Sequence, residues 1–389
     1  MADAVVDKLS RNAVDVLPEG ALEEKLKRGK PLRVKLGIDV TSPDIHVGRG
    51  IPLQRMRAFQ DEGHKAVLII GDYTTRIGDP SGRSAERPIL SDEEIDRNAQ
   101  LYLEQAKAIL RDDPELLEVR RNGEWLSTLT FADVVRLTRT VTVARLLERD
   151  DFAKRYAARQ PISVSELLYP LMQAYDSVAV EADVELGGTD QLYNLLAGRE
   201  VMEAYGLEPQ VVLTTPLLVS WDREKMSSSQ GNNIPLTAPP EEMFGRTMRI
   251  PDSLLDEWWR LVAESDPPST DPLESKLALA RWIVARSWGE DAAREAEAHF
   301  TRVVREGQAP EEVEEAEVQW TREDDAPIYL PSVLKTHFGQ TTSHWRRTID
   351  QGGVRLNGQP VAAYEVAAEE LDGALLQAGK RQFLRVHLA

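Results

Sequence analysis

The sequence contains no cysteine and no long hydrophobic run. The absence of cysteine excludes disulfide bonds and metal sites built from thiolates. The longest apolar stretch, residues 66–71, has the length of a β-strand and not of a membrane-spanning helix. The first seventeen residues carry scattered charges and no apolar core of the kind found in a secretory signal. We therefore expect a cytoplasmic protein without a membrane segment.

The chain also lacks an excess of positive charge. Its formal net charge is −18 at pH 7, which argues against a protein that coats nucleic acid non-specifically. The charge is distributed unevenly, because residues 306–325 hold nine acidic residues and one arginine, whereas residues 329–389 hold seven basic and five acidic residues. Such a C-terminal segment can contact phosphate locally while the rest of the surface repels it.

The N-terminal half has the pattern of an α/β protein. With 389 residues, 42% of them hydrophobic and 29% charged, the chain is typical of a soluble protein of two or three domains. Residues 32–38 and 65–71 are predicted strands, and the helical stretch at 48–62 completes a strand–helix–strand unit. Such units form parallel sheets with right-handed crossovers. Residues 91–157 are expected to be helical, and residues 210–213 to form another buried strand.

The sequence changes in character after Pro235. Residues 255–262 and 273–288 carry apolar residues at helical spacing, and the acidic stretch that follows is typical of a partly helical linker. The last sixty residues combine a predicted helix with short strand-like pieces. We predict a Rossmann-like parallel-sheet catalytic domain over residues 1–235, an α-helical domain with the acidic linker over 236–326, and a small α+β domain over 327–389.

A loop follows the first strand of the predicted sheet, where open parallel sheets bind their ligands. It reads GIDVTSPDIHVGRG over residues 37–50 and leads into a helix whose N-terminus attracts phosphate. Its glycines would let the backbone approach a nucleotide, its hydroxyl and imidazole can donate to phosphate oxygens, and its arginine adds a fixed positive charge. These residues are Gly37, Gly48, Thr41, His46 and Arg49. Taken alone, the segment could also be an ordinary connection in which Thr41 or Ser42 caps the helix.

A second polar loop lies about 180 residues further on, at residues 224–232 (EKMSSSQGN). A lysine, Lys225, followed by three serines and a glycine makes a mobile loop able to close over phosphates. By itself such a loop is usually a surface turn. The two loops together, in this order, favour a phosphate-binding function.

Together the two loops resemble the HIGH and KMSKS signatures of class I aminoacyl-tRNA synthetases. Three further segments resemble parts of bacterial tyrosyl-tRNA synthetases, namely residues 71–84 (GDYTTRIGDPSGRS), 169–177 (YPLMQAYDS) and 184–194 (VELGGTDQLYN). The stretch TSHWRRTIDQGGVRLNGQPV, residues 342–361, resembles the S4-like RNA-binding module of these enzymes. The resemblance covers nearly the whole chain.

The polar residues of one predicted helix fit an amino-acid pocket. Tyr169, Gln173 and Asp176 are spaced i, i+4 and i+7, which places them on one helix face. A core helix carries leucine at such positions, and inward-facing polar groups need partners. A bound tyrosine would supply them, with its ammonium near Tyr169, Gln173 and Asp79 and its phenol hydroxyl on Asp176. The alternative is a solvated stripe, which the apolar residues around these positions argue against.

The resemblance implies a tyrosine–tRNA ligase. Such an enzyme forms tyrosyl-adenylate and pyrophosphate from L-tyrosine and ATP, and then transfers tyrosine to the 3′-terminal adenosine of tRNA(Tyr). The tyrosine carboxylate is itself the nucleophile, so catalysis should come from positioning and from stabilising charge on the phosphates. Mg²⁺ would arrive with ATP, and we expect neither a dedicated metal site nor a tightly bound cofactor. The family forms homodimers, here through a helical insertion at about residues 100–165.

The resemblance also implies roles for individual residues. Catalysis falls to Thr41, His46, Arg49 and Lys225. Tyrosine would be bound by Asp39, Asp79, Tyr169, Gln173, Asp176 and Gln191. ATP would be bound by Gly37, Thr41, His46, Gly48, Gly188, Asp190, Lys225 and Ser228. The leaving pyrophosphate would meet Arg83 and Arg87, and RNA phosphates would meet Arg346, Arg347, Arg355, Lys380 and Arg381.

Three positions depart from the family pattern. Arg49 stands where many members carry the second histidine of HIGH, and Ser228 replaces the second lysine of KMSKS, so the loop brings one ammonium and not two. Lys35 occupies a place where some members have a tyrosine that contacts the substrate phenol. We expect Lys35 at the edge of the pocket, with an ion pair to Asp79 or Asp176 as the alternative.

Two other functions remain open at this point. A tryptophanyl-tRNA synthetase shares the fold, but an aspartate placed to accept from a phenol suits tyrosine, and the S4-like tail also argues against this reading. A catalytically silent paralogue that only binds RNA is favoured by Arg49 and Ser228 alone.

Overall fold

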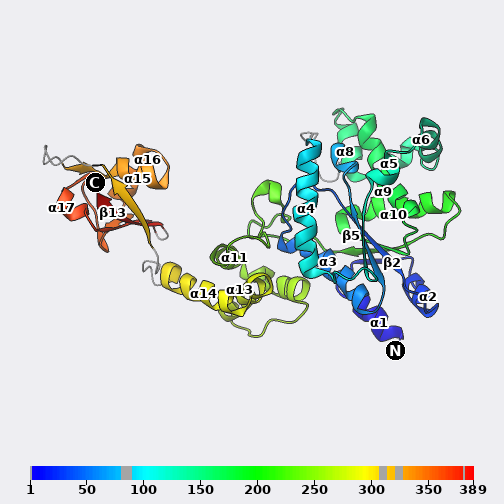
Figure 1. Ribbon diagram of the computed structural model, residues 1–389, viewed down its shortest axis with the longest axis horizontal. Coiled ribbons are helices and arrows are strands. Elements are labelled where there is room, and N and C mark those ends of the chain that lie inside the picture. The colour runs from blue at the N-terminus through cyan, green and yellow to red at the C-terminus, as the bar shows by residue number, and fades with distance from the viewer. Residues whose placement is uncertain (1, 80–89, 306–312, 320–326, 380–381) are drawn as a thin grey trace. The chain divides into compact units, whose positions relative to one another are not determined.

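The computed structural model describes residues 2–79, 90–305, 313–319, 327–379 and 382–389 (Figure 1). The chain divides into two units, one made of residues 1–238 and 249–279, the other of residues 239–248 and 280–389. No helix in the described ranges is long and apolar enough to span a membrane.

The first unit is built on a six-stranded sheet with the strand order β1-β6-β5-β2-β3-β4. All neighbours run parallel except β1, which pairs antiparallel with β6 at one edge. The predicted α/β parallel sheet is thus confirmed, with an antiparallel edge strand that the prediction lacked. The strands are β1 (Asp15–Leu17), β2 (Arg33–Ile38), β3 (Lys65–Ile70), β4 (Leu117–Arg121), β5 (Val184–Gly188) and β6 (Val211–Thr215).

Helices cover both faces of this sheet. The longer ones are α1 (Ala2–Leu9), α2 (Ala21–Lys27), α3 (Val47–Asp61), α4 (Asp92–Ile109), α6 (Phe131–Thr138), α8 (Asp150–Ala157), α9 (Val164–Ala179) and α10 (Leu192–Ala204). Shorter ones are α5 (Gly123–Leu126), α7 (Val143–Leu146), α12 (Leu255–Trp258), η1 (Thr74–Arg76), η2 (Thr189–Gln191), η3 (Ser228–Gln230), η4 (Asp252–Leu254) and η5 (Trp259–Ala263). Helix α13 (Pro272–Trp288) runs across the division between the two units.

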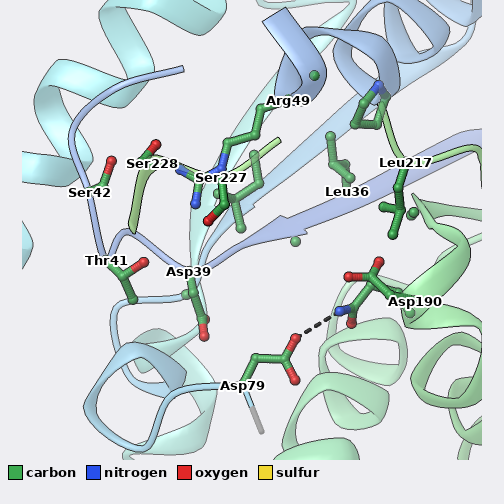
Figure 2. Close-up of a pocket in the computed structure, with 18 of the residues that line it drawn as sticks. Leu36, Asp39, Thr41, Ser42, Arg49, Asp79, Asp190, Leu217, Ser227 and Ser228 are labelled. Carbon is green, nitrogen blue, oxygen red and sulfur yellow. Dashed lines mark hydrogen bonds between the residues drawn. The ribbon is translucent and has the colours of Figure 1, made fainter. Parts of the chain in front are cut away.

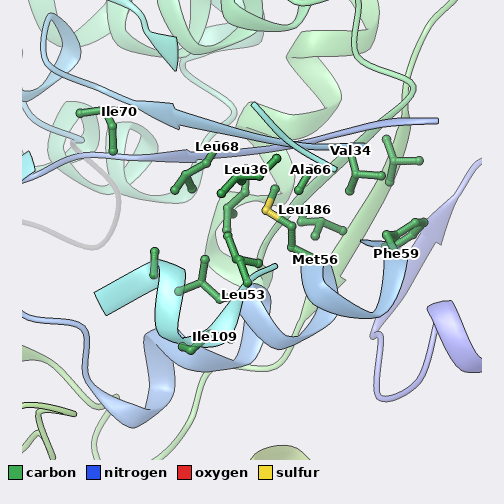
Figure 3. Close-up of a cluster of buried hydrophobic side chains, with 14 of the residues drawn as sticks. Val34, Leu36, Leu53, Met56, Phe59, Ala66, Leu68, Ile70, Ile109 and Leu186 are labelled. Carbon is green, nitrogen blue, oxygen red and sulfur yellow. The ribbon is translucent and has the colours of Figure 1, made fainter. Parts of the chain in front are cut away.

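Side chains of the central strands point alternately to the two faces of the sheet. On one face, side chains of β2 and β3 pack against α3, whose Leu53, Met56 and Phe59 point towards the sheet (Figure 3). On the other face, Val67 and Ile69 of β3 pack with residues of α5 and α9. Because both faces are covered, the run AVLII that follows Lys65 is apolar throughout, as buried parallel strands are.

The sheet opens between β2 and β5. These two strands are paired only at Val34–Val184 and Lys35–Glu185. Beyond that point β2 continues beside β3, and β5 continues beside β6. From β2 the chain adds β3 and β4 on one side of this gap, and β5 and β6 lie on the other side. The strand order thus reverses at the gap, and open α/β sheets bind their ligands at such a reversal.

Two segments differ from the prediction. Residues 91–157 are not helical throughout, because β4 pairs in parallel with β3 and forms the second edge of the sheet. Only Leu117 of this strand is buried, so its sequence LEVRR has no continuous apolar run to mark it. In the stretch interpreted as a linker, residues 314–318 form β7, of which only Ala316 is buried. Edge strands that are mostly exposed carry charge freely, which hides them from hydrophobicity patterns.

The second unit contains a five-stranded sheet of order β10-β9-β12-β13-β7 and a two-stranded sheet of β11 and β8. Strand β7 runs parallel to β13, and the other pairs are antiparallel. The strands are β7 (Glu314–Val318), β8 (Ile328–Tyr329), β9 (Val354–Leu356), β10 (Gln359–Pro360), β11 (Glu365–Val366), β12 (Leu375–Ala378) and β13 (Gln382–Leu388). The helices are α11 (Pro240–Thr247), α14 (Glu290–Phe300), η6 (Thr301–Arg305), α15 (Leu330–Phe338), α16 (Thr342–Asp350) and α17 (Ala368–Leu371).

Candidate active site

A cavity of about 960 Å³ lies where β2 and β5 separate. The ends of β2, β3, β5 and β6, the helix α9 and the loop before η3 all contribute to its wall (Figure 2). Arg49, Ser227 and Ser228 lie at one end of this space, and Asp79 lies at the other. The site residues predicted from the sequence that line it are Gly37, Asp39, Thr41, His46, Gly48, Arg49, Asp79, Tyr169, Gln173, Asp176, Gly188, Asp190, Gln191, Lys225 and Ser228.

Helix α9 carries the polar stripe into this cavity. The helix begins at a capping box in which Ser163 and Glu166 exchange hydrogen bonds with each other's main-chain N–H groups. Its residues Tyr169 and Asp176 are buried and Gln173 is half-buried, and all three line the cavity. The stripe is therefore not a solvated helix face.

Asp176 is a buried carboxylate held by two donors. The indole N–H of Trp125 donates to Oδ1 at 2.8 Å, and the amide of Asn122 donates to Oδ2 at 3.3 Å. Burial raises the pKa of Asp176 to about 7, although the charge of Lys35 and these two hydrogen bonds lower it and the charge of Glu185 raises it further. Because a carboxylate has about four acceptor sites, Asp176 can accept from a further donor in the cavity that it lines.

A second group of polar side chains surrounds two other carboxylates. The hydroxyl of Tyr169 donates to Asp39 at 3.0 Å, and the amide of Gln191 donates to Asp79 at 2.7 Å. Burial and the neighbouring carboxylate of Asp39 raise the pKa of Tyr169 well above its ordinary value, so the phenol stays a donor. The amide of Asn194 donates to Gln191 at 2.9 Å and fixes its orientation. Two carboxylates with one arginine, Arg149, 3.5 Å from Asp79, leave this end of the cavity with an excess of negative charge that suits a cation.

Lys35 is not at the edge of the pocket, which corrects the prediction. Its side chain is fully buried beneath the cavity and does not line it. The ammonium forms an ion pair with Glu185 at 2.8 Å, and not with Asp79 or Asp176. Glu185 lies directly opposite Lys35 on the neighbouring strand, a pairing that the sequence alone does not reveal.

His46 caps the first helix that follows β2. Its Nδ1 accepts from the main-chain N–H of Arg49 at 3.3 Å, so the proton of the neutral ring is on Nε2. Burial, with the charges of Arg49 and Lys225, lowers the pKa of His46 to about 3. At neutral pH the ring is thus an uncharged donor beside the N-terminus of α3.

The serine-rich loop is joined to the His46 segment through the main chain. Val47 N–H donates to Ile234 O at 2.9 Å, and His46 forms a β-bridge with Pro235. The buried side chain of Asn232 shapes the loop, because it accepts from Ser227 N–H at 2.7 Å and donates to the carbonyl of Lys225 at 3.1 Å. The Lys225 ammonium reaches across the cavity mouth to Asp190 at 2.5 Å.

The predicted RNA-binding residues of the second unit are surface side chains. Arg346 and Arg347 on α16 and Arg355 on β9 are exposed. The guanidinium of Arg346 lies over the rings of Tyr329 and Tyr364, at 5.5 and 5.7 Å from their centroids. Arg83, Arg87, Lys380 and Arg381 fall outside the described residues.

Sequence reasoning missed the donors that come from edge strand β4. Asn122 and Trp125 follow this strand directly, and both contact Asp176. It also missed Arg149, which contacts Asn194 at 3.1 Å and lies 3.5 Å from Asp79. A tryptophan after an Asn-Gly pair was a visible signal, but only the pairing of β4 with β3 brings it to Asp176.

Comparison with protein families identifies the family of the chain. Residues 27–316 match the family model described as tRNA synthetases class I (W and Y). The chain belongs to this family. Among the described residues, no group of three or more His, Asp or Glu side chains is arranged to hold a metal ion.

Curated relatives match almost end to end. A tyrosine–tRNA ligase of Thermotoga maritima is 44% identical over 391 residues, covering 97% of this chain and 96% of its own. A tyrosine–tRNA ligase of Haemophilus influenzae is 43% identical over 399 residues, covering 99% and 97%. The resemblance to bacterial tyrosyl-tRNA synthetases is thereby confirmed.

Solved structures share the fold. The tyrosyl-tRNA synthetase of Archaeoglobus fulgidus, complexed with L-tyrosine, has a TM-score of 0.63 and 22% identity, and the match covers 76% of this chain and 99% of that one. The tyrosyl-tRNA synthetase of Pyrococcus horikoshii, also complexed with L-tyrosine, has a TM-score of 0.60 and 18% identity, with coverage of 77% and 96%.

Proposed function

We propose that this chain is a tyrosine–tRNA ligase, which activates L-tyrosine with ATP and transfers it to tRNA(Tyr). The observation that carries the proposal is the buried carboxylate of Asp176, which two donors flank and which lines a cavity shared with His46 and Lys225. The near-complete match to bacterial tyrosine–tRNA ligases supports the same conclusion.

Tyrosine spans the cavity from Asp176 to Asp79. Its phenol hydroxyl donates to Asp176, which already accepts from two fixed donors. Its ammonium lies among the carboxylates of Asp39 and Asp79, the hydroxyl of Tyr169 and the amide of Gln173, with Gln191 beside it. Phenylalanine carries no hydroxyl to donate to Asp176, and a buried acceptor left without its donor is costly.

ATP occupies the end of the cavity formed by the two signature loops. Its phosphates meet the N-terminus of α3, where main-chain N–H groups and the helix dipole favour negative charge. Thr41, His46, Arg49, Lys225 and Ser228 supply further donors and charge there. Gly37 and Gly48 leave room for the nucleotide, and Gly188 and Asp190 contact its ribose.

The reaction needs alignment more than acid–base chemistry. The tyrosine carboxylate attacks the α-phosphorus of ATP, the bond to the bridging oxygen breaks, and pyrophosphate leaves. Neutral His46 donates to oxygens on which negative charge accumulates, and Lys225 balances the charge of the leaving group. Mg²⁺ enters as part of the nucleotide substrate. Arg83 and Arg87 are proposed contacts of the leaving pyrophosphate.

The second unit carries the proposed tRNA contacts. Exposed Arg346, Arg347 and Arg355, with Lys380 and Arg381, would pair with backbone phosphates and so position the tRNA without reading its sequence. The proposed helical domain at residues 236–326 is a further surface for the tRNA. We place the enzyme in the cytoplasm, where translation consumes its product.

An ATP–pyrophosphate exchange assay with the purified chain tests the function. Exchange that depends on tyrosine, and is absent with tryptophan, supports the proposal. Exchange with tryptophan alone would show a tryptophanyl enzyme. An absence of exchange with either amino acid would indicate a silent RNA-binding paralogue. Its loss of activity would be attributed to Arg49 and Ser228, which depart from the family pattern.

Tyrosine activation is expected to depend on pH near neutrality. Because the pKa of Asp176 is raised to about 7, the carboxylate becomes protonated as pH falls below this value. A protonated carboxyl surrounded by donors accepts the phenol poorly, so kcat/KM for tyrosine should rise with pH and level off above about pH 8. His46, with a pKa of about 3, does not titrate in this range. A flat profile between pH 6 and 8 would contradict the assignment.

Gly37 offers a test of the nucleotide end. A Cβ added here would meet no protein atom within 4 Å, and the residue lines the cavity. Gly37→Ala should therefore raise the KM for ATP by roughly tenfold through a clash with substrate, without lowering the thermal midpoint. Gly245→Ala, also without neighbours within 4 Å but in helix α11, is the matched control and should leave both KM values unchanged. Lost stability in Gly37→Ala would contradict this account.

We also propose a homodimer formed through residues of about 100–165. Large apolar side chains are exposed on this segment, with Phe131 at 85% and Val164 at 73% exposure. Others in the segment are Val135, Val143 and Tyr156. Exposed apolar side chains concentrated in one segment are typical of an interface.

Phe131→Glu is expected to shift the dimer towards monomer. The substitution occurs twice in a symmetric dimer, so the dissociation constant should rise by roughly 100-fold or more. Sedimentation velocity over a dilution series measures the change. Val14→Glu, at an apolar residue that is 58% exposed outside this segment, should not affect it. Equal effects of both substitutions would place the interface elsewhere.

A further inference from the structure

A buried ion pair lies beneath the cavity wall, where the two halves of the sheet separate. Lys35 of β2 and Glu185 of β5 are register partners at the last position where these strands pair. Their side chains are 0% and 1% exposed, and their Nζ and Oε1 atoms are 2.8 Å apart. Beyond them the strands separate around the substrate cavity.

The same pair holds helix α9. The Lys35 ammonium donates to the main-chain carbonyl of Gln173 at 2.9 Å and to the hydroxyl of Ser177 at 2.7 Å. Glu185 accepts from that hydroxyl at 3.2 Å, from the Gln173 amide at 3.3 Å and from the amide of Gln210. The contacts bracket the turn of α9 that presents Gln173 and Asp176 to the cavity.

A buried ion pair is an expensive way to join strands to a helix. Its desolvation cost offsets most of the attraction, and well-packed apolar side chains of similar size usually serve stability as well or better. The position of this pair, directly under the polar stripe of α9, gives it a use that an apolar pair would not have. Its charges act on Asp176 through a low-dielectric interior.

We propose that Lys35 and Glu185 are positioning residues of the tyrosine site, which fix α9 and act on Asp176 with opposite charges. This inference rests on the proposed function, since it assigns the pair a role in binding the phenol. Neither residue touches the substrate, because both lie beneath the cavity wall.

The charged and polar groups that face Asp176 come from several elements. Lys35 of β2 favours the carboxylate, whereas Glu185 of β5 disfavours it. Trp125 of α5 and Asn122, which follows β4, donate to it. Tyr169 of its own helix also interacts with its charge. Removing the lysine should therefore raise the pKa of Asp176, and removing the glutamate should lower it.

Opposite shifts in a pH profile test the proposal. The pH midpoint of kcat/KM for tyrosine, measured by pyrophosphate exchange, should move up by about one unit in Lys35→Met and down by a similar amount in Glu185→Gln. The KM for ATP should stay within about twofold in both. A purely structural role would weaken both variants without moving their midpoints in opposite directions, and that outcome would overturn the proposal.

Two further variants complete the test, one as a replacement for a variant that does not fold and one as a control. The double variant Lys35→Met/Glu185→Gln should have a midpoint between those of the single variants, so it replaces Lys35→Met if that protein does not fold. Lys25→Met removes another buried lysine, paired with Asp183 at 3.2 Å outside the cavity, and should leave the midpoint unchanged. Absence of exchange in the wild type would refute the proposed function itself. Wild-type exchange with unmoved midpoints in the variants would refute only the role of the ion pair.

Discussion

Replacing Asp176 with asparagine is expected to lower kcat/KM for tyrosine activation by roughly 10- to 100-fold, with the KM for ATP within about twofold of wild type. The carboxylate can accept from Trp125, Asn122 and the substrate phenol at once. An amide has one acceptor oxygen and turns an NH₂ group towards the remaining donors. A hydrogen bond to a charged group is worth about 1.5–3 kcal/mol, which gives the expected range.

The same substitution should remove a cost to the stability of the fold that grows as pH rises. The folded-state pKa of Asp176 is about 7, above the value of an unfolded aspartate, so the folded protein binds the extra proton between these values. Stability is thus lost as pH rises towards 7, by about 4 kcal/mol for this shift. Asp176→Asn removes this cost, so its thermal midpoint relative to wild type should rise between pH 5 and pH 8.

Asp252→Asn is the matched control. This carboxylate is exposed and forms a surface ion pair with Lys276, so its loss should change neither kinetics nor stability much. The measurements are steady-state exchange kinetics with tyrosine and phenylalanine, together with thermal unfolding at two pH values. Near-normal tyrosine activation in Asp176→Asn, or an unchanged preference over phenylalanine, would remove Asp176 from the phenol site.

Short-range sequence patterns predicted the segments around the cavity well. The strand–loop–helix segment around His46 and the helix with Tyr169, Gln173 and Asp176 could be predicted because each is continuous in the sequence. The strand and the helices in them have a regular period. The topology then brought both to the same opening in the sheet, and every described residue of the predicted catalytic, tyrosine and ATP sets lines one cavity.

Partners that come from distant strands could not be predicted in this way. Glu185 pairs with Lys35 only because β5 and β2 are neighbours in the sheet, although 150 residues separate them in the chain. Trp125 and Asn122 reach Asp176 from an edge strand whose charged sequence resembles a helix or loop. Pairing between strands is set by the three-dimensional fold and leaves no local period in the sequence.

The prediction of the exposed edge strands failed for the same physical reason. Residues 314–318 read as an acidic linker because three of the five are glutamate, yet they pair along β13 through their main chain. Hydrogen bonds between main-chain groups do not depend on side-chain polarity, so a charged segment can add to a sheet wherever one face stays in water.

Replacing His46 with asparagine is expected to lower the rate of tyrosyl-adenylate formation by roughly 100- to 1000-fold, with less than a threefold change in the KM for tyrosine. The ring is neutral because its pKa is about 3, and its Nε2–H is the donor that remains once Nδ1 has capped α3. Asparagine can still cap the helix through its side-chain oxygen, so the fold at this point survives. What it loses is a donor of the right length, held in place before charge develops on the phosphate, and such donors are worth this much in rate.

His64→Asn separates this role from a structural one. His64 is also buried, and its Nδ1 likewise accepts a main-chain N–H, that of Leu32 at 3.2 Å, but it does not line the cavity. Its replacement should lower the thermal midpoint and leave single-turnover adenylate formation within about twofold of wild type. If both variants slowed the chemical step equally, the effect of His46 would come from the packing around α3. A loss confined to His46→Asn assigns the phosphate contact to the imidazole, because only that ring stands beside Arg49 and Lys225 at the helix N-terminus.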